Sequence, residues 1–279
     1  MQKTILITGC SSGIGAELAR ELARRGHRVY ATARSPEALA PLAAEGLRTL
    51  ALDVNDDASI ARAFEVVAAE AGALDLLINN AGFSQVGAVV DLAREDLRRQ
   101  FETNVFSPVA VTRAALPLLR AAVAKNGGAV LANVGSVLGH FTTPFAGAYC
   151  ASKAALHSLT DALRMELAPF GIRVVSIEPG RVRSRLGEHA AEKVRLPQDS
   201  VYRSIAERIR ERAQAGQRRS TPVEAFSVPV VDALLRDPPP RVIRGGKISR
   251  IGPLLKRFLP AAAFDRGLAR RFGLDRLKP

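Results

Sequence analysis

The sequence predicts a single doubly wound α/β domain, with a parallel sheet and helices on both of its faces. Two observations lead to this fold class. Short apolar runs alternate with longer stretches whose apolar residues recur at helical spacing, which is typical of strands joined by crossover helices. The first run, Thr4–Ile7, leads directly into a glycine-rich turn and then into a helical pattern. The 279 residues show no internal repeat and no low-complexity segment, so we predict one domain over residues 1–279.

The strands and helices can be placed in order along the chain. We predict strands over 4–7, 27–33, 47–52, 74–79, 129–134 and 173–177, with a short last strand near 242–243. Helical patterns follow the glycine turn and cover 56–69, 92–123 and 149–170. A further helix is expected to begin with a capping box, Thr-Pro-Val-Glu, at 221–224. We interpret the polar and charged residues 185–219 as a lid over a pocket.

The formal charge of +13 is concentrated in a C-terminal tail, residues 241–279. Eleven Lys and Arg residues against two Asp give this tail a charge of +9, but few aromatic residues lie among them, so we predict no nucleic-acid partner. Between Pro253 and Pro260, four apolar residues are spaced to form one helical face: Leu254, Leu255, Phe258 and Leu259. So short a helix needs a surface to pack against. We expect it to fold back over the pocket, with peripheral association with an anionic membrane as the alternative.

Other features of the sequence bear on the location of the protein and on metal binding. We expect Cys10 and Cys150 to be reduced thiols. Residues 1–3 lead directly into the first strand, so we expect no signal peptide and a cytoplasmic location. No uninterrupted apolar run approaches the ~18 residues of a spanning helix. No metal site is predicted, because no ligand spacing connects the four histidines, His27, His140, His157 and His189.

The turn Thr8–Gly15 is the first candidate site. Its sequence, Thr-Gly-Cys-Ser-Ser-Gly-Ile-Gly, follows a predicted strand and opens a predicted helix, which is the context of a dinucleotide fingerprint. Glycines let the backbone approach a pyrophosphate, and the free N–H groups of a helix N-terminus favour the anion. The glycine spacing is G-x-x-x-G-x-G rather than the usual G-x-G-x-x-G.

Tyr149 and Lys153 form the second candidate site. They are four residues apart on a predicted helix, so the phenol and the ammonium lie on one face. A free tyrosine has a pKa near ~10, and a cation within ~4–6 Å lowers it, which favours a proton donor or acceptor tuned towards neutral pH. Ser136 lies thirteen residues before Tyr149, at the end of a predicted strand, where its hydroxyl can orient the phenol.

Asn104 lies four residues before Pro108 in the predicted helix 92–123. Because proline has no N–H, the carbonyl of Asn104 loses its usual helical partner, which predicts a kink. The free carbonyl can hold an ordered water that leads to Lys153. An incidental kink that packing offsets is the alternative.

In motif order, residues 3–184 resemble the short-chain dehydrogenase/reductase family. The family pattern is matched at every motif, namely Thr8–Gly15, Asn79–Gly82, Asn104, Ser136, Tyr149 with Lys153, and Pro179-Gly180. The wording of the motifs is most similar to the branch that holds 17-beta-hydroxysteroid and retinol dehydrogenases. The resemblance implies a Rossmann fold and an enzyme that interconverts a hydroxyl and a carbonyl by hydride transfer with a nicotinamide cofactor. The alternative is a non-catalytic NADP(H)-binding sensor or a membrane-associated scaffold.

The resemblance also implies the roles of individual residues. Tyr149 acts as the acid in reduction and the base in oxidation, Lys153 lowers its pKa and holds the cofactor ribose, Ser136 stabilises the substrate oxygen, and Asn104 supports a proton relay. Together with the candidates derived above, the expected cofactor-binding set is Gly9, Ser11, Ser12, Gly13, Ile14, Gly15, Arg34, Asp53, Val54, Asn80, Ala81, Gly82, Tyr149, Lys153, Pro179, Gly180, Val182 and Ser184.

The residues Ala33 and Arg34 favour NADP(H). An acid about ~20 residues past the glycines would bind the ribose 2′-hydroxyl of NAD(H), and this place holds Ala33-Arg34 instead. A guanidinium binds a 2′-phosphate, whereas a carboxylate repels it. Ser12 stands where many NADP-preferring relatives carry a basic residue, so NAD(H) is the alternative cofactor.

The substrate and the assembly follow from apolar surfaces. The loop 137–145 is mostly apolar and borders the catalytic centre, which predicts a hydrophobic substrate such as a steroid, a retinoid or a fatty carbonyl. The helices over 104–123 and 149–170 carry apolar residues on more than one face, and relatives pair these helices across a two-fold axis. We therefore expect a homodimer or a homotetramer.

Overall fold

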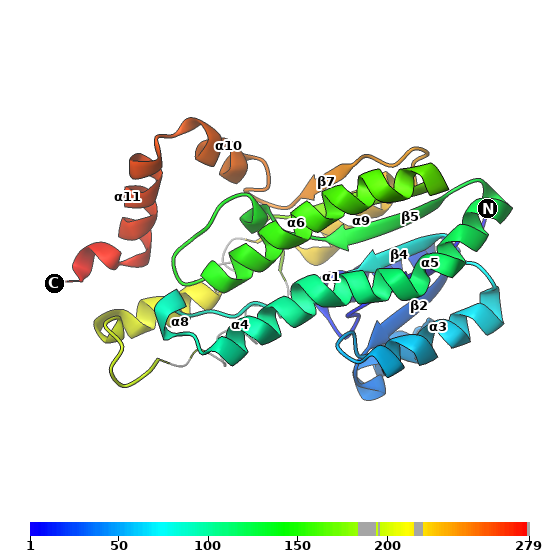
Figure 1. Cartoon of the computed structure of the whole chain (residues 1–279), viewed down its shortest axis with the longest axis horizontal. Coiled ribbons are helices and arrows are strands. Elements are labelled where there is room, and N and C mark those ends of the chain that lie inside the picture. The colour runs from blue at the N-terminus through cyan, green and yellow to red at the C-terminus, as the bar shows by residue number, and fades with distance from the viewer. Residues whose placement is uncertain (184–193, 195, 215–219, 278–279) are drawn as a thin grey trace.

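A seven-stranded parallel sheet lies at the centre of the chain (Figure 1). The structure is a computed structural model that describes residues 1–183, 194, 196–214 and 220–277. The strands are β1 (Thr4–Ile7), β2 (Arg28–Ala33), β3 (Arg48–Ala51), β4 (Leu76–Asn79), β5 (Ala129–Val134), β6 (Ile172–Pro179) and β7 (Val242–Gly245). Their order is β3-β2-β1-β4-β5-β6-β7, which reverses between β1 and β4. At such a point a parallel sheet opens a crevice at the carboxyl ends of its strands. The predicted doubly wound fold is confirmed.

Helices cover both faces of the sheet. One face carries α1 (Gly13–Arg24), α2 (Ala40–Ala44) and α9 (Val223–Leu234), and the other carries α3 (Asp57–Ala71), α5 (Ser107–Asn126) and α6 (Gly147–Leu167). Four further helices lie at the end towards which the strands point (Figure 1), namely α4 (Arg94–Phe101), α8 (Ala206–Gln214), α10 (Ile251–Phe258) and α11 (Ala261–Phe272). Short 3-10 turns cover Pro36–Leu39, Val89–Asp91, Val137–Gly139, Ala168–Phe170, Arg203–Ile205 and Leu274–Arg276.

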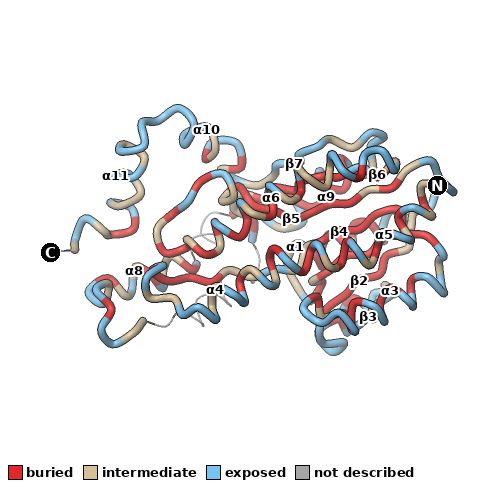
Figure 2. The backbone as a smooth tube through the Cα atoms, in the orientation of Figure 1, coloured by how far each residue is buried: buried red, intermediate tan, exposed pale blue. Residues whose placement is uncertain are grey.

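The alternation of side chains along the strands produces two cores. Ile5 and Ile7 of β1 pack with α1 and α9 on one face, whereas Leu6 packs with α3 and α5 on the other. Figure 2 shows the strands buried and the outer sides of the helices exposed. Because both faces are covered, the strands are continuous apolar runs, as is usual for a parallel sheet.

The predicted helix 92–123 contains an irregular turn at the expected place. A π turn, Glu102–Phe106, separates α4 from α5, and the N–H of Ser107 donates to the carbonyl of Glu102, five residues earlier. Pro108 has no N–H to give to the carbonyl of Asn104, so the regular helical ladder cannot continue through this turn. The predicted break in the helix is therefore confirmed.

The same helical stretch bears on the membrane expectation. Over Arg94–Asn126 the chain is long and apolar enough to cross a membrane by length and composition alone, among the residues that the structure describes. However, 44% of the tested window is buried inside the fold, and α5 packs on the sheet, as the core helix of a globular protein does.

The capping box expected at 221–224 is wrong. The helix α9 begins at Val223 after Pro222, and its first turn has no side-chain cap. Thr221 is used elsewhere: its backbone bonds Arg181 and Arg183, and its hydroxyl accepts from the N–H of Lys247 at 3.1 Å. This bridge to the chain after β6 leaves the hydroxyl no freedom to cap the helix.

The tail folds as two helices rather than as one short helix between prolines. Pro253 lies within the first turn of α10, where a missing N–H is tolerated, and Pro260 directly precedes α11. The four apolar residues expected to cover the pocket lie on α10 or directly after it and are 42–74% exposed, so that expectation is wrong for them: Leu254, Leu255, Phe258 and Leu259. It is α11 that turns back towards α8 (Figure 1) and buries Phe272.

Candidate active site

A cleft of about 540 Å³ opens at the carboxyl ends of the central strands. It is bordered by the turn after β1, the ends of β2 and β3, the loop after β4, the turn after β5, α6 and the chain after β6. Most of the predicted site residues line it: Gly9, Ser11, Ser12, Gly13, Ile14, Gly15, Arg34, Asp53, Val54, Asn80, Ala81, Gly82, Ser136, Tyr149, Lys153, Pro179, Gly180 and Val182. Asn104 is instead buried behind the cleft, and Ser184 lies outside the described residues.

The turn between β1 and α1 has the shape that a dinucleotide phosphate needs. Gly9 and Gly13 have positive φ angles of 74° and 61°, which other residues rarely adopt. A Cβ on Gly15 would collide with the side chain of Asn80. No side chain caps the start of α1, so its first N–H groups are available to an anion. The turn therefore fits the pyrophosphate of a nicotinamide cofactor.

Asn80 holds this turn in place. Its side chain donates to the carbonyls of Thr8 and Gly9 at 2.8 and 3.0 Å. In return, the hydroxyl of Thr8 accepts from the backbone N–H groups of Asn80 and Ala81, both at 3.0 Å. The loop after β4 is thus fastened to the glycine turn across the switch point of the sheet.

The ends of β2 and β3 form the opposite end of the cleft. Arg34 is exposed there, and Asp53 accepts from the backbone N–H of Asn55 at 3.0 Å. A guanidinium beside a hydroxyl-lined turn can bind a phosphate, and a carboxylate can accept from an adenine amino group. The geometry leaves both groups facing the cleft.

Tyr149, Lys153 and Ser136 meet in the middle of the cleft. Tyr149 and Lys153 lie in α6, and the Nζ atom of Lys153 is 5.9 Å from the centre of the Tyr149 ring. The ammonium donates to the carbonyl of Val134 at 2.7 Å. Ser136 follows β5 and hydrogen-bonds Tyr149, while its Oγ accepts from the N–H of Leu138 at 3.2 Å. The three side chains that the motifs identify are therefore neighbours.

The pKa of Tyr149 shifts in the direction opposite to the one predicted. Burial raises it to about 12, and the hydrogen bond from Ser136 and the charge of Arg212 only partly offset this. Burial also lowers the pKa of Lys153 to about 8. The desolvation of both groups outweighs their proximity, because a buried site disfavours the charged form of each. At neutral pH the phenol keeps its proton.

The side chain of Asn104 is committed to structure. Its amide donates to the carbonyl of Phe83 and to the hydroxyl of Ser152, both at 3.1 Å, and its Oδ1 accepts from the N–H of Phe83, also at 3.1 Å. These bonds fasten the loop after β4 to α6 next to Tyr149. The proposed water relay from the backbone carbonyl of Asn104 stays a prediction.

The fold brings together two histidines that sequence spacing does not connect. His140, His157 and Glu178 place their ligand atoms within 4.8 Å of one another. Arg244 donates to the Glu178 carboxylate at 2.7 Å, beside the 2.8 Å contact from His140. Although burial opposes it, these contacts lower the pKa of Glu178. The guanidinium already supplies the positive charge that a metal would bring, so we assign no metal to this group.

Several cleft residues were missed from the sequence. Arg99, Arg181, Arg212 and Arg271 line the cleft together with Ile248, Leu268 and Phe272. They come from α4, α8, α11 and two loops, and no motif links them. Leu138 and Phe141 also line the cleft, as predicted for the loop 137–145. Within the predicted lid 185–219, the described part contributes Arg212 and Ala213.

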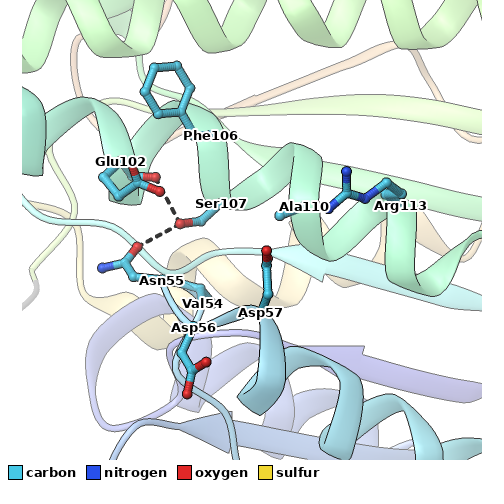
Figure 3. A pocket seen from close by; sticks show the side chains of 9 residues that line it. All are labelled: Val54, Asn55, Asp56, Asp57, Glu102, Phe106, Ser107, Ala110 and Arg113. Atoms are coloured by element: carbon cyan, nitrogen blue, oxygen red, sulfur yellow. Dashed lines mark hydrogen bonds between the residues drawn. The ribbon is translucent and has the colours of Figure 1, made fainter.

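A second hollow of about 560 Å³ lies between the start of α3 and the π turn (Figure 3). There the hydroxyl of Ser107 donates to Asn55 at 2.7 Å and to the carbonyl of Glu102 at 2.8 Å. Of the predicted site residues, only Val54 borders it. The hollow therefore belongs to the joint between the loop after β3 and α5, not to the cleft with Tyr149.

A doubly wound sheet with a glycine turn at its switch point defines a dinucleotide-binding α/β protein. The family model described as short chain dehydrogenase matches residues 3–195. The chain therefore belongs to this family of oxidoreductases. A short-chain dehydrogenase/reductase of Pestalotiopsis microspora is 35% identical over 98% of this chain and 95% of its own length. The resemblance to the hydroxysteroid and retinol dehydrogenase branch stays a prediction.

Solved structures agree with this assignment. The crystal structure of a short-chain dehydrogenase from Streptomyces avermitilis has a TM-score of 0.78 and 30% identity, over 99% of this chain and 98% of that one. A 3-ketoacyl-(acyl-carrier-protein) reductase from Brucella melitensis, complexed with NADH, has a TM-score of 0.63 and 31% identity over 66% and 78% of the two chains. The Pseudomonas aeruginosa RhlG/NADP active-site complex has a TM-score of 0.63 and 31% identity, over 76% of this chain and 87% of that one. Two of these three structures thus contain a nicotinamide cofactor.

Proposed function

We propose that the protein is an NADP(H)-dependent oxidoreductase of the alcohol dehydrogenase or carbonyl reductase type, which interconverts a hydroxyl and a carbonyl on a hydrophobic substrate. One observation carries the proposal: Tyr149, hydrogen-bonded to Ser136, lies beside Lys153 in the same cleft as the glycine turn. A binding protein that only senses the cofactor has no need of this proton donor. The non-catalytic sensor is therefore the weaker alternative.

The residues of the chain account for the proton and for the position of the substrate. A bound nicotinamide supplies the hydride to the carbonyl carbon in reduction and accepts it in oxidation. Tyr149 gives its phenolic proton to the carbonyl oxygen and takes it back in the reverse direction. Ser136 donates to the same oxygen as negative charge develops. Lys153, whose ammonium is fixed by the carbonyl of Val134 at 5.9 Å from the centre of the Tyr149 ring, would hold the ribose of a bound cofactor.

Arg34 supports NADP(H) as the preferred cofactor. Its exposed guanidinium borders the end of the cleft where the ribose 2′-phosphate would lie, and the nearest cleft carboxylate, Asp53, is engaged by the N–H of Asn55. The RhlG complex holds NADP, whereas the Brucella reductase holds NADH, so relatives use both cofactors. The proposal of NADP(H) therefore rests on this chain's own arginine.

The walls around Tyr149 favour a hydrophobic substrate. Leu138, Phe141, Leu268 and Phe272 line the cleft, and the rings of Phe141 and Phe264 of α11 meet edge to face with 6.0 Å between ring centres.

We also propose that the enzyme is cytoplasmic, binds no nucleic acid and forms a homodimer or homotetramer.

The test is a panel of aldehydes, ketones and alcohols, assayed with NADPH, NADH and their oxidised forms. Wild type should reduce apolar carbonyls with NADPH, and Tyr149→Phe should lose turnover by several orders of magnitude, since phenylalanine has no proton to transfer. Tyr202→Phe is the matched control, because Tyr202 packs against Phe145 outside the cleft. Cofactor binding by Tyr149→Phe should persist. Near-normal turnover by that variant would refute the mechanism.

One observation favours a second role, peripheral contact with lipid. The apolar residues Ile251, Leu254 and Phe258 of α10 are more than half exposed, next to Lys256 and Arg257. An apolar face flanked by basic residues suits an anionic bilayer surface. Sedimentation with anionic vesicles, with wild type and Phe258→Glu, distinguishes this role from a tail that serves only the cleft.

A further inference from the structure

The cleft is more cationic than hydride transfer requires. Among the residues that the structure describes, six basic side chains line it against a single carboxylate, Asp53, at the end near Arg34. Lys153 and Arg34 are accounted for by the proposed function. The remaining four have no role in it: Arg99, Arg181, Arg212 and Arg271.

Arg212 stands out among them because of its geometry. It projects from α8, and its Nη2 group donates to the hydroxyl of Thr143 at 2.8 Å. Thr143 is buried in the loop that connects Ser136 to Tyr149, so this bond fixes the guanidinium beside the catalytic tyrosine. The Cζ atom also lies 5.6 Å from the centre of the Phe272 ring. The arginine is thus held from two sides.

Most of its hydrogen-bonding capacity is unused. A guanidinium carries five N–H donors, and the bond to Thr143 uses one. The Nε atom is buried and has no hydrogen-bond partner among the described residues. A buried donor without an acceptor is costly and uncommon in native proteins. A ligand that accepts from this group would remove that cost.

The charge is unbalanced as well. Across the part of the chain that the structure describes, Arg212 forms no ion pair, and the groups that act on it most strongly are Tyr149, Cys150, Arg181 and Arg271. None of these four is a carboxylate, and two of them are cations. By contrast, even the exposed Arg25 has two acidic partners, Glu21 and Asp232. A buried cation without a counter-ion destabilises a fold unless something else supplies negative charge.

We propose that the substrate carries a carboxylate that binds Arg212, at one end of an apolar chain whose carbonyl or hydroxyl reaches Tyr149. This inference deepens the proposed function and rests on it. The planar fork of a guanidinium matches a carboxylate with two parallel hydrogen bonds. The apolar wall beside it, Phe141, Leu268 and Phe272, suits the chain between the two polar ends. Arg181 and Arg271 add positive charge around the same anion.

The phosphates of the cofactor carry the same kind of charge, so the two sources must be separated. The glycine turn and Arg34 already form two phosphate sites on the nucleotide side. Arg212 instead bonds the loop between Ser136 and Tyr149, on the substrate side of the phenol. The arrangement therefore assigns Arg212 to the substrate.

The first experiment measures binding without turnover. Octanoate and its neutral match, methyl octanoate, are titrated calorimetrically into wild type saturated with NADP⁺. Octanoate should bind at least tenfold more tightly than the ester. Arg212→Met keeps the apolar stem and should weaken octanoate binding about a hundredfold, equivalent to ~2.8 kcal/mol at ~1.4 kcal/mol per tenfold, and ester binding much less. Arg212→Lys should recover part of the loss, and a normal circular dichroism spectrum verifies the fold of each variant.

The matched control is Arg210→Met, on the same helix but exposed and paired with Glu207. It should leave both affinities unchanged. Equal binding of octanoate and ester by wild type would overturn the proposal. So would an equal loss of both ligands in Arg212→Met, or a loss of NADP⁺ affinity with octanoate unaffected, since the latter would place a cofactor phosphate on Arg212.

A second experiment separates this proposal from the reaction itself. Medium-chain oxo acids and their methyl esters are compared by kcat/KM. If octanoate binding depends on Arg212 but no carbonyl compound turns over, the anion site stands and the proposed reaction fails. If neutral ketones turn over and octanoate does not bind, the reaction stands and the anion site fails.

Discussion

Among single residues, burial determines the pKa values of the candidate catalytic groups. The four-residue spacing of Tyr149 and Lys153 was enough to predict that they are neighbours. It could not predict the direction of their pKa shifts, because a motif contains no information on solvent exposure. Burial raises the pKa of Tyr149 to about 12 and lowers that of Lys153 to about 8. The phenol is therefore a proton donor in the resting protein.

Arg34 carries the prediction about cofactor choice. NADPH should bind wild type at least tenfold more tightly than NADH, or ~1.4 kcal/mol, because the guanidinium pairs with the 2′-phosphate. Arg34→Leu should remove most of this difference, and Ala33→Asp with Arg34→Leu should reverse it. Fluorescence titration with both cofactors measures the ratio, and Arg241→Leu, an exposed arginine outside the cleft, is the control. Equal binding of both cofactors by wild type would mean that Arg34 is no phosphate site.

His157 should give the fold a dependence on pH. It packs under the turn that carries Ser136, whose N–H donates to Nε2 at 3.4 Å, and within the described part of the chain its buried Nδ1 has no hydrogen-bond partner. Burial lowers the pKa of His157 from 6.5 to about 4. Between these values the unfolded chain binds a proton that the folded chain does not. The contribution of neutral His157 to the free energy of unfolding should therefore be complete above pH 6.5 and should be lost as the pH falls towards 4.

Urea unfolding of wild type and His157→Gln at pH 8 and pH 5 checks this prediction. Glutamine does not titrate, so wild type should lose more stability than the variant between the two pH values. The advantage of wild type over the variant should thus be smaller at pH 5. An advantage that is the same at both pH values would show that His157 does not carry the dependence.

At the level of elements, periodicity placed the helices and strands well and their ends less well. The predicted strand 74–79 begins at Leu76, because the N–H of Leu74 instead bonds the carbonyl of Leu118 in α5. Thr221 looked like a cap but forms the bridge to the chain after β6. Both errors have one cause: local sequence does not reveal which tertiary partner competes for a backbone group.

The tail shows the same limit and yields a prediction. Its sequence pattern favoured the apolar face of α10 as a cover for the cleft, but α10 is exposed and Phe272 of α11 is buried in the cleft wall. Phe272→Ala should raise KM for apolar substrates about tenfold by removing that wall, with NADPH affinity unchanged. Phe258→Ala, on the exposed face of α10, should leave KM unchanged. Deleting residues 251–279 should reproduce the effect of Phe272→Ala. If Phe258→Ala raises KM and Phe272→Ala does not, α10 rather than α11 covers the cleft.

For the molecule as a whole, the sequence predicted the part of the site that the sheet organises. The glycine turn, Ser136 and Pro179 each lie at the carboxyl end of a strand, and the carboxyl ends of parallel strands meet at one edge, so their convergence follows from the fold class. The cationic wall could not be predicted in this way. Arg181, Arg212 and Arg271 lie far apart in the chain, and only the packing of α8 and α11 beyond that edge brings them together.

The outer surface of α5 and α6 gives the prediction about assembly. Phe106 and Val109 at the start of α5 are 55% and 40% exposed, and Met165 near the end of α6 is 64% exposed. Large apolar side chains on helices that also form the core favour burial against a second copy. Light scattering at micromolar concentration should show a dimer or tetramer. Phe106→Arg with Met165→Arg should shift it towards monomer, while Val90→Arg, at a more exposed apolar residue in the turn Val89–Asp91, should not. A wild type that is only monomeric would refute the prediction, and an assembly that survives the double substitution would place its interface on another face.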